Sequence, residues 1–132
     1  MEEEVDRQER VWFAKGEEDL YTAKRLVTDE YFPVGIVCFH CQQCAEKYLK
    51  GLLVHLGANF SKSHDLIYLL EVSKDRQLIQ TLHDDADLLT GYAIEPRYPG
   101  EDSDLPITAA HDAIRCAEAV KAAVLEKRGS RT

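Results

Sequence analysis

The stretch from Pro33 to Gly57 constrains the fold more than any other part of the chain. Pro33 suits the first turn of a helix, and Gly57 suits the residue just past a helix end. The roughly two dozen residues between them are enough for a helix of about 35 Å. At about 100° per residue, one side of it carries Val34, Val37, Cys41, Cys44, Ala45, Tyr48, Leu52 and Leu56. The other side mixes apolar Ile36, Phe39 and Val54 with polar His40, Gln43, Lys47 and Lys50. Because it is apolar on most of its circumference, this helix is expected at the centre of a bundle.

The length and charge of the chain limit the number of domains it can form and the kinds of ligand it can bind. With 132 residues, of which 45% are hydrophobic, it is expected to form a single domain over residues 1–132 with a sizeable core. Residues 1–6 are expected to be a frayed acidic lead-in. The net charge of −8 argues against a protein whose whole surface grips nucleic acid, but it allows a small local anion site.

The expected compartment is the cytoplasm. No run approaches the roughly 18 apolar residues of a membrane span, and no membrane partner is expected. The start MEEEVDRQER is acidic where a signal peptide is basic and then apolar. Four cysteines without an export signal suggest free thiols in a reducing environment.

Helical periodicity recurs along the rest of the chain, and strand alternation is nearly absent. Further helices are expected over about residues 7–28, 65–73, 75–92 and 108–128. Ser63 or Asp65 is expected to cap the second of these, Thr108 is expected to cap the last one, and Gly129 is expected to end it. The fold class is therefore all-α, an up-and-down bundle of four to five helices. Gly16, which weakens the first helix, is interpreted as a point of close approach to a neighbouring helix.

Three cysteines share the central stretch, as C-x-x-C-x-x-C, with Cys116 as a possible fourth. This spacing invites an iron–sulfur interpretation. However, Cys38, Cys41 and Cys44 lie within a strong helical pattern, where free cysteine behaves as a small buried hydrophobe. Core packing is the favoured interpretation, and neither a metal nor a cofactor is expected.

Two His-Asp dipeptides resemble the metal-binding pair of phosphohydrolases, but two-residue matches are weak. Asp65 and Asp112 each lie near an expected helix start, where a carboxylate is favoured. His111 is interpreted as a surface residue. His64 precedes a helix and lies close to Lys62, which makes it the more interesting histidine.

Two basic features could hold an anion. The loop of residues 93–105 contains Arg97 and Tyr98, where arginine suits phosphate or carboxylate and tyrosine offers a ring face and a hydroxyl. The alternative is that Arg97 pairs with acidic residues of its own loop. On the central helix, Gln43, Lys47 and Lys50 form one stripe, for which the alternative is an ordinary solvated face.

The order of several motifs carries a family resemblance. The chain contains EEDLYTA, then FHCQQCAEKYLKGLL, then KSHDL, then EPRYP before an Ala-rich last helix. This order resembles the HEPN domain family (higher eukaryotes and prokaryotes nucleotide-binding) over about residues 10–128. The resemblance implies a helical bundle that commonly dimerises and is often encoded beside a minimal nucleotidyltransferase, as its partner or as half of a toxin–antitoxin pair.

The resemblance also implies site residues. Members that cut RNA carry Arg followed four to six residues later by His, whereas Arg97 is followed by no histidine in that window. The favoured hypothesis is therefore a non-catalytic nucleotide- or partner-binding module, and enzyme activity is not favoured. The polar set carried over consists of Lys47, Lys50, His64, Asp65, Arg97 and Tyr98.

Two other hypotheses remain open. One is a metal-independent endoribonuclease that uses Arg97 with His64. The other is a purely structural partner protein with a homodimer or nucleotidyltransferase interface on the outer side of the central helix, formed by Ile36, Phe39, Gln43 and Val54. The binding and structural hypotheses are compatible with each other.

Overall fold

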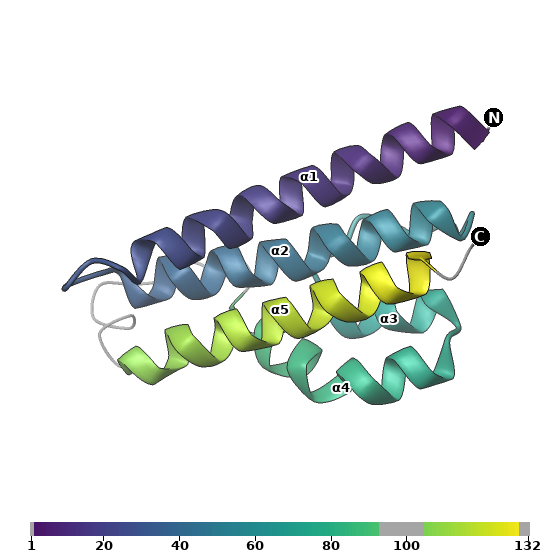
Figure 1. Cartoon of the computed structure of the whole chain (residues 1–132). Helices are drawn as coiled ribbons and strands as arrows, with labels where there is room; N and C mark the ends of the chain where they lie inside the picture. Colours follow the sequence, from purple (N-terminus) through teal and green to yellow (C-terminus); the bar gives the residue numbers. More distant parts are fainter. Residues whose placement is uncertain (1, 93–104, 130–132) are drawn as a thin grey trace.

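The computed structural model describes residues 2–92 and 105–129, and within them the chain forms five α-helices and no strand. The helices are α1 (Glu2–Leu26), α2 (Val34–His55), α3 (Leu66–Ser73), α4 (Arg76–Thr90) and α5 (Ile107–Gly129). Helices α1, α2 and α5 form the long part of the bundle, and the shorter α3 and α4 pack beside α2 and α5 (Figure 1). The all-α bundle predicted from the sequence is confirmed.

The central position of α2 is also confirmed. This helix contacts all four others and buries residues on most of its circumference. It begins after Pro33, and its C-cap Leu56 is followed by Gly57 with a φ of +71°, a left-handed conformation that favours glycine. Leu56 itself was predicted to face the core but is 51% exposed, because it lies just past the last helical turn.

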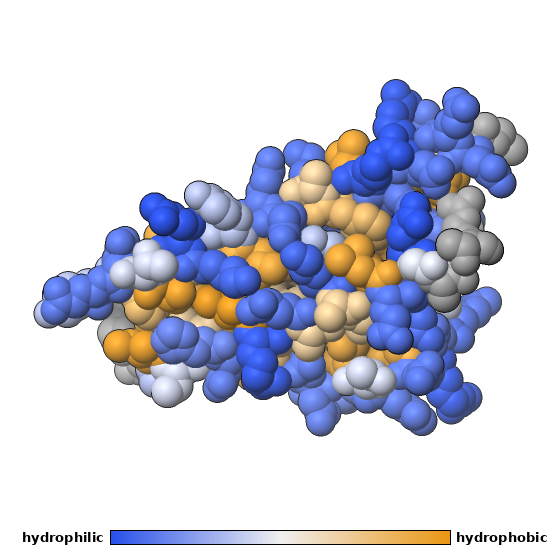
Figure 2. Space-filling view, viewed as in Figure 1, coloured by the Kyte–Doolittle hydropathy of each residue, from blue (hydrophilic) through white to orange (hydrophobic). Residues whose placement is uncertain are grey.

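The core is built from the faces that helical periodicity predicts. All four cysteines are fully buried thiols, so their interpretation as core residues is confirmed. Apolar residues are visible in a band between α1 and α5, with hydrophilic residues covering the outer sides of these helices (Figure 2). His111 is exposed, as predicted, and lies just past the first turn of α5.

Gly16 marks the close approach of α1 to α2. A Cβ atom at this position would lie 2.8 Å from Cδ2 of Tyr48 and 3.2 Å from the backbone oxygen of Cys44. A separation of 2.8 Å is shorter than carbon atoms tolerate without a shift. Glycine therefore sets the distance between the two helices, as the sequence suggested.

Two helix boundaries differ from the predictions. Helix α1 begins at Glu2 and so includes residues that were expected to fray; its first turn holds Glu2, Glu3 and Glu4, whose charges favour a helix N-terminus. Helix α5 begins at Ile107, so Thr108 lies inside the first turn and is not its N-cap. The N–H of Ala109 bonds instead to the carbonyl of Pro106.

The predicted cap of α3 is confirmed. Asp65 accepts hydrogen bonds from the N–H groups of Ile67 and Tyr68. Asp75 caps α4 in the same manner by accepting from the N–H of Leu78. Each cap satisfies a backbone donor that would otherwise lack a partner at the helix start.

Candidate functional site on the outer side of α2

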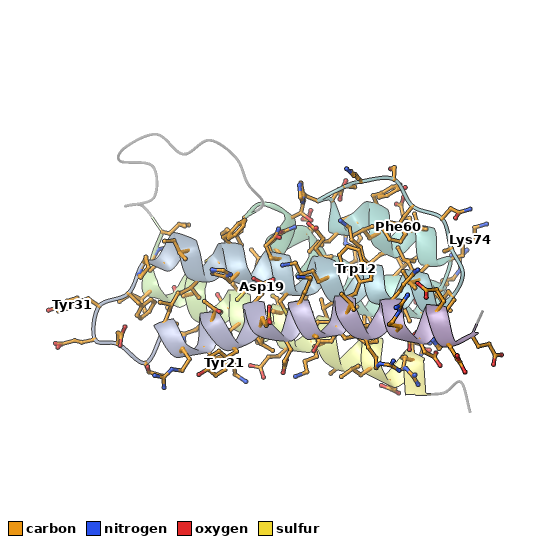
Figure 3. The ribbon with its side chains drawn as sticks, turned by 90° about the horizontal axis from the view of Figure 1, so that it is seen from above. Trp12, Asp19, Tyr21, Tyr31, Phe60 and Lys74 are labelled. Carbon is orange, nitrogen blue, oxygen red and sulfur yellow. The ribbon has the colours of Figure 1, made fainter. Side chains whose placement is uncertain are left out.

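One side of α2 carries side chains that are exposed or partly exposed, apart from the buried Lys50, and we call it the open face. It is bordered on one side by α1, through Asp19, and on the other by the segment before α3, through His64. In Figure 3, Asp19 and Trp12 lie along the edge of α1 beside α2, and Phe60 lies beyond α2. The open face consists of Ile36, His40, Gln43, Lys47, Lys50 and Val54.

The first cluster on the open face, the Asp19 cluster, centres on a carboxylate from α1. Asp19 is only 9% exposed. Its Oδ1 lies 2.8 Å from Nδ1 of His40, and its Oδ2 accepts a hydrogen bond from Nζ of Lys47 at 2.5 Å. Burying a carboxylate is costly unless it is paired. Both oxygens of Asp19 have found partners on α2.

The second cluster, the Glu46 cluster, centres on a carboxylate from α2 itself. Glu46 is 4% exposed, its Oε2 lies 2.9 Å from Nζ of Lys50, and its Oε1 lies 2.7 Å from Nδ1 of His64. Nζ of Lys50 also lies 5.6 Å from the centre of the Trp12 ring, within the range of a cation–π contact. Glu46 therefore brings together Lys50 and His64, two residues of the predicted polar set.

A pair of glutamines attaches the segment before α3 to this cluster. The side-chain amide of Gln42, which is fully buried, donates to the backbone oxygen of His64 at 3.0 Å and to Oε1 of Glu46 at 3.3 Å. The amide of Gln43 in turn donates to Oε1 of Gln42 at 2.7 Å. The position of His64 is therefore fixed by both its backbone and its ring.

The two histidines are oriented in the same way. A carboxylate only accepts hydrogen bonds, so Asp19 and Glu46 each place a hydrogen on Nδ1 of the histidine they hold. The other ring nitrogen of each imidazole, Nε2, takes no part in the contact with the carboxylate. The side chain of His64 is 57% exposed, whereas that of His40 is mostly covered. His64 is thus an oriented imidazole that a ligand can reach.

The remaining predicted ligand residues are distributed as follows. Lys47 belongs to the Asp19 cluster and not to the Glu46 cluster. Asp65 follows His64 directly, but its carboxylate serves as the cap of α3. Arg97 and Tyr98 lie outside the described residues.

The predicted interface residues all lie along the outer side of α2. Ile36 is 51% exposed, and Phe39, Gln43 and Val54 are partly exposed. The Phe39 ring makes an edge contact with the His40 ring, with centroids 5.5 Å apart. Apolar Ile36 and Val54 thus flank the two polar clusters at opposite ends of the helix.

Sequence reasoning missed the anchors of these clusters, and it missed a third cluster altogether. Glu9 of α1 is fully buried, with Oε2 at 2.7 Å from Nδ1 of His55 and Oε1 at 2.8 Å from Nε of Arg128. This cluster ties α1, α2 and α5 together at one end of the bundle. It adjoins a hollow of about 570 Å³ lined by Glu2, Glu4, Val5, Val54, His55, Leu56 and Gly57.

The buried thiols offer little chemistry. Burial raises the pKa of Cys44 to about 12, and burial together with the Asp85 carboxylate raises the pKa of Cys116 to about 12. The thiol, which is not the reactive form, is therefore favoured at neutral pH. Within residues 2–92 and 105–129, no group of three or more His, Cys, Asp or Glu side chains is arranged to hold a metal ion.

In the part of the chain that the structure describes, no helix combines the length and the apolar character that crossing a membrane requires.

Comparisons with known proteins agree with the fold. Among solved structures, TT1696 from Thermus thermophilus is similar, with a TM-score of 0.76 and 27% identity, covering 91% of this chain and 98% of that one. The structure of ST0689, described as an archaeal HEPN homologue, has a TM-score of 0.74 and 25% identity, covering 92% of this chain and 98% of that one.

Sequence comparison gives a relative and a family. "Putative toxin MJ1304" from Methanocaldococcus jannaschii is 27% identical over 97 residues, which are 68% of this chain. The match spans 62% of the length of that relative. The family model described as HEPN domain matches residues 9–128. Because this match covers most of the length of the chain, the chain belongs to the HEPN domain family.

Proposed function

We propose that the protein is a non-catalytic, dimeric helical module that binds a nucleotide or a partner protein through the open face of α2. It would work in a toxin–antitoxin-like pair or with a minimal nucleotidyltransferase in the cytoplasm. Membership of the HEPN family and the relative named as a toxin support this proposal.

The observation that carries the proposal is the Glu46 cluster. Burying a glutamate and a lysine costs free energy that an apolar pair of the same size would not. Charged pairs that replace an apolar, well-packed interior are expected mainly at functional sites. Here the buried pair holds an exposed, oriented imidazole at His64.

The cations of the open face define the type of ligand. Lys47 and Lys50 are each paired with one carboxylate, and a phosphate would accept from the remaining N–H donors of their ammonium groups. Such attraction is local and weakens with salt. His64 would donate or accept a hydrogen bond, and Asp65 would fix the backbone next to it. Arg97 and Tyr98 are proposed to complete the contacts, as a phosphate ligand and a stacking face.

Calorimetric titration with ATP, GTP and a short RNA tests this function. We expect His64→Ala and Arg97→Ala to weaken binding at least about tenfold, which corresponds to the 1.4 kcal/mol of a charge-assisted hydrogen bond. His83→Ala is the matched control, because His83 is another exposed histidine, on α4. Absence of binding to all three ligands would remove the nucleotide from the proposal and leave the partner protein.

One observation favours a second function, that of a metal-independent endoribonuclease. The pairing of His64 Nδ1 with Glu46 leaves Nε2 as a group that could move a proton during phosphodiester cleavage. Arg97 would stabilise the charge of the phosphate. Incubation of the protein with total RNA tests this: cleavage lost in His64→Ala and Arg97→Ala but kept in His83→Ala would support it.

A further inference from the structure

Trp12 is the only tryptophan of the chain, and it lies on α1 at the border of the open face. Figure 3 shows it beside α2, on the side of α1 toward Phe60. The neighbouring ring of Phe13 packs against the hydrophobic core and stacks on the Tyr48 ring, with centroids 5.4 Å apart. Trp12 is not one of the residues packed against that core. Two adjacent aromatic residues of α1 therefore have different surroundings.

One face of the Trp12 ring covers the Glu46 cluster. Nζ of Lys50 lies 5.6 Å from the centre of the ring, and the same ammonium group is paired with Glu46 at 2.9 Å. Because Lys50 is only 7% exposed, the ring face above it is the inner face. Trp12 is nevertheless partly exposed, so its exposure belongs to the outer face and the edge of the ring.

The indole N–H of Trp12 also points to a ligand. Within residues 2–92 and 105–129 this group donates to no acceptor, and no buried side-chain nitrogen or oxygen in these ranges lacks a hydrogen-bond partner. The N–H is therefore accessible from the solvent. A tryptophan that serves only as packing usually pairs this group with an acceptor in the protein. Here the donor is left for a bound molecule.

We propose that Trp12 binds the base of a nucleotide at the open face. The outer face of its ring stacks on the base, and the exposed imidazole of His64 contacts the phosphate of the same ligand. This inference rests on the proposed function and names the part of the ligand that α1 recognises. Base stacking on an aromatic side chain tolerates every base, so the ligand class is a nucleoside phosphate or single-stranded RNA without a required sequence.

The contacts of one ion pair place the two ligand groups near each other. The Trp12 ring rests on Lys50, and Nδ1 of His64 lies 2.7 Å from Oε1 of Glu46, so each ring is one contact away from the Glu46–Lys50 pair. A flat apolar group and an anionic group joined in one molecule match this arrangement. A cationic ligand does not, because the Lys50 ammonium already interacts with the ring and like charges repel.

Calorimetric titration with ATP and with inorganic tripolyphosphate, which has no base, tests the role of Trp12. We expect Trp12→Leu to weaken the binding of ATP about tenfold, within the range for one stacked base, and to leave the binding of tripolyphosphate unchanged. Trp12→Phe keeps an aromatic face and should retain most of the affinity for ATP. An equal loss for the two ligands in Trp12→Leu would overturn the proposal, because it would show that Trp12 acts only through packing.

The fluorescence of the wild-type protein gives a second test that needs no variant. Because the chain has one tryptophan, its emission reports on Trp12 alone. A base stacked on the indole should quench this emission as ATP is added, with excitation at the red edge where ATP does not absorb. Tripolyphosphate should leave the emission nearly unchanged. ATP that binds by calorimetry without changing the emission would overturn the proposal even if Trp12→Leu does not fold.

Phe13→Leu is the matched control, because it changes the adjacent aromatic residue, whose ring stacks on Tyr48. It should bind ATP as the wild type does, with circular dichroism checking that each variant is folded. If the wild type binds RNA but not ATP, an RNA oligomer and its abasic counterpart replace the two ligands. Nucleotide binding that Trp12→Leu leaves unchanged would overturn this inference alone. Absence of binding to every nucleotide would overturn it together with the nucleotide of the proposed function.

Discussion

Nδ1 of His64 lies 2.7 Å from Oε1 of Glu46, although 18 residues separate the two along the chain. This contact joins α2 to the segment before α3 and places the imidazole at the edge of the open face. The other oxygen of Glu46 is held by Lys50. The carboxylate that pairs with buried Lys50 is therefore the same one that orients His64, a residue of the proposed binding site.

Replacement of Glu46 by glutamine is expected to destabilise the protein strongly. It would leave the ammonium group of Lys50, which is only 7% exposed, without its carboxylate. Removing one partner of a buried ion pair costs about 3–5 kcal/mol. Denaturant unfolding would measure the loss, and the Glu46→Gln, Lys50→Met double variant should recover most of it. Glu118→Gln, which removes an exposed partner of Lys24, should cost less than about 1 kcal/mol; equal losses in the two single variants would contradict the role of burial.

Replacement of Gly16 by alanine is expected to destabilise the contact between α1 and α2. The added Cβ would lie 2.8 Å from Tyr48 and would also approach the backbone of Cys44, which cannot give way as a side chain can. Overpacking of this kind costs about 1–3 kcal/mol, against a gain of up to about 1 kcal/mol in helix propensity. Thermal unfolding of Gly16→Ala and Gly129→Ala gives the comparison, because a Cβ at Gly129 meets nothing within 4 Å. A Gly16→Ala protein more stable than the wild type would contradict this prediction, because it would show that α1 can move away from α2 to accommodate the added methyl group.

The stability that Asp75 contributes is expected to depend on pH. The N–H of Leu78, with a smaller contribution from the Lys127 ammonium, holds the pKa of this carboxyl below its usual value of 3.8. A carboxyl with a lowered pKa in the folded state stabilises it above the unfolded pKa, and this contribution is lost as the pH falls through the folded pKa. Asp75→Ala should therefore cost about 1 kcal/mol at pH 7, the usual value of a lost N-cap, and less below about pH 3.8. Asp87→Ala, an exposed change on the same helix, is the control, and a loss from Asp75→Ala that is constant between pH 7 and pH 3 would contradict the assignment.

The four thiols are expected to react with Ellman's reagent only when the protein unfolds. Burial disfavours the thiolate of Cys44, whose pKa is raised to about 12, and also raises the pKa of Cys41 well above its usual range. Since the thiolate is the reacting form, the rate of labelling at pH 8 should follow the rate of unfolding and rise with denaturant. Rapid labelling of the native protein would show that the core between α2 and α5 opens readily.

Several features of the fold were predictable because they depend on local sequence. Pro33 and Gly57 bound α2 as predicted, Asp65 and Asp75 occupy helix starts, and Gly16 marks the approach of a neighbour. The start of α1 was not predictable from composition. An acidic run looks like a frayed end, yet its charges also stabilise the N-terminus of a helix.

The candidate site was predictable only in part. The sequence placed Lys47 and Lys50 on one stripe and singled out His64, but their anchors, Asp19 and Glu46, resemble ordinary solvated charges in a helical pattern. Glu9 was overlooked for the same reason, because its partners His55 and Arg128 lie 46 and 119 positions away. The sequence around a charged residue does not indicate whether segments far away in the chain will bury it.

By itself, the sequence determined that this protein is a helical bundle around one long apolar helix, because hydrophobic periodicity and capping residues act within a few turns of the chain. Only the tertiary structure decided which charges are buried and paired, because that depends on helices packing side by side at positions far apart in sequence. Asp19, Glu46 and Glu9, which each hold a histidine, belong to this second class, and the candidate site around Asp19 and Glu46 exists only in the folded protein.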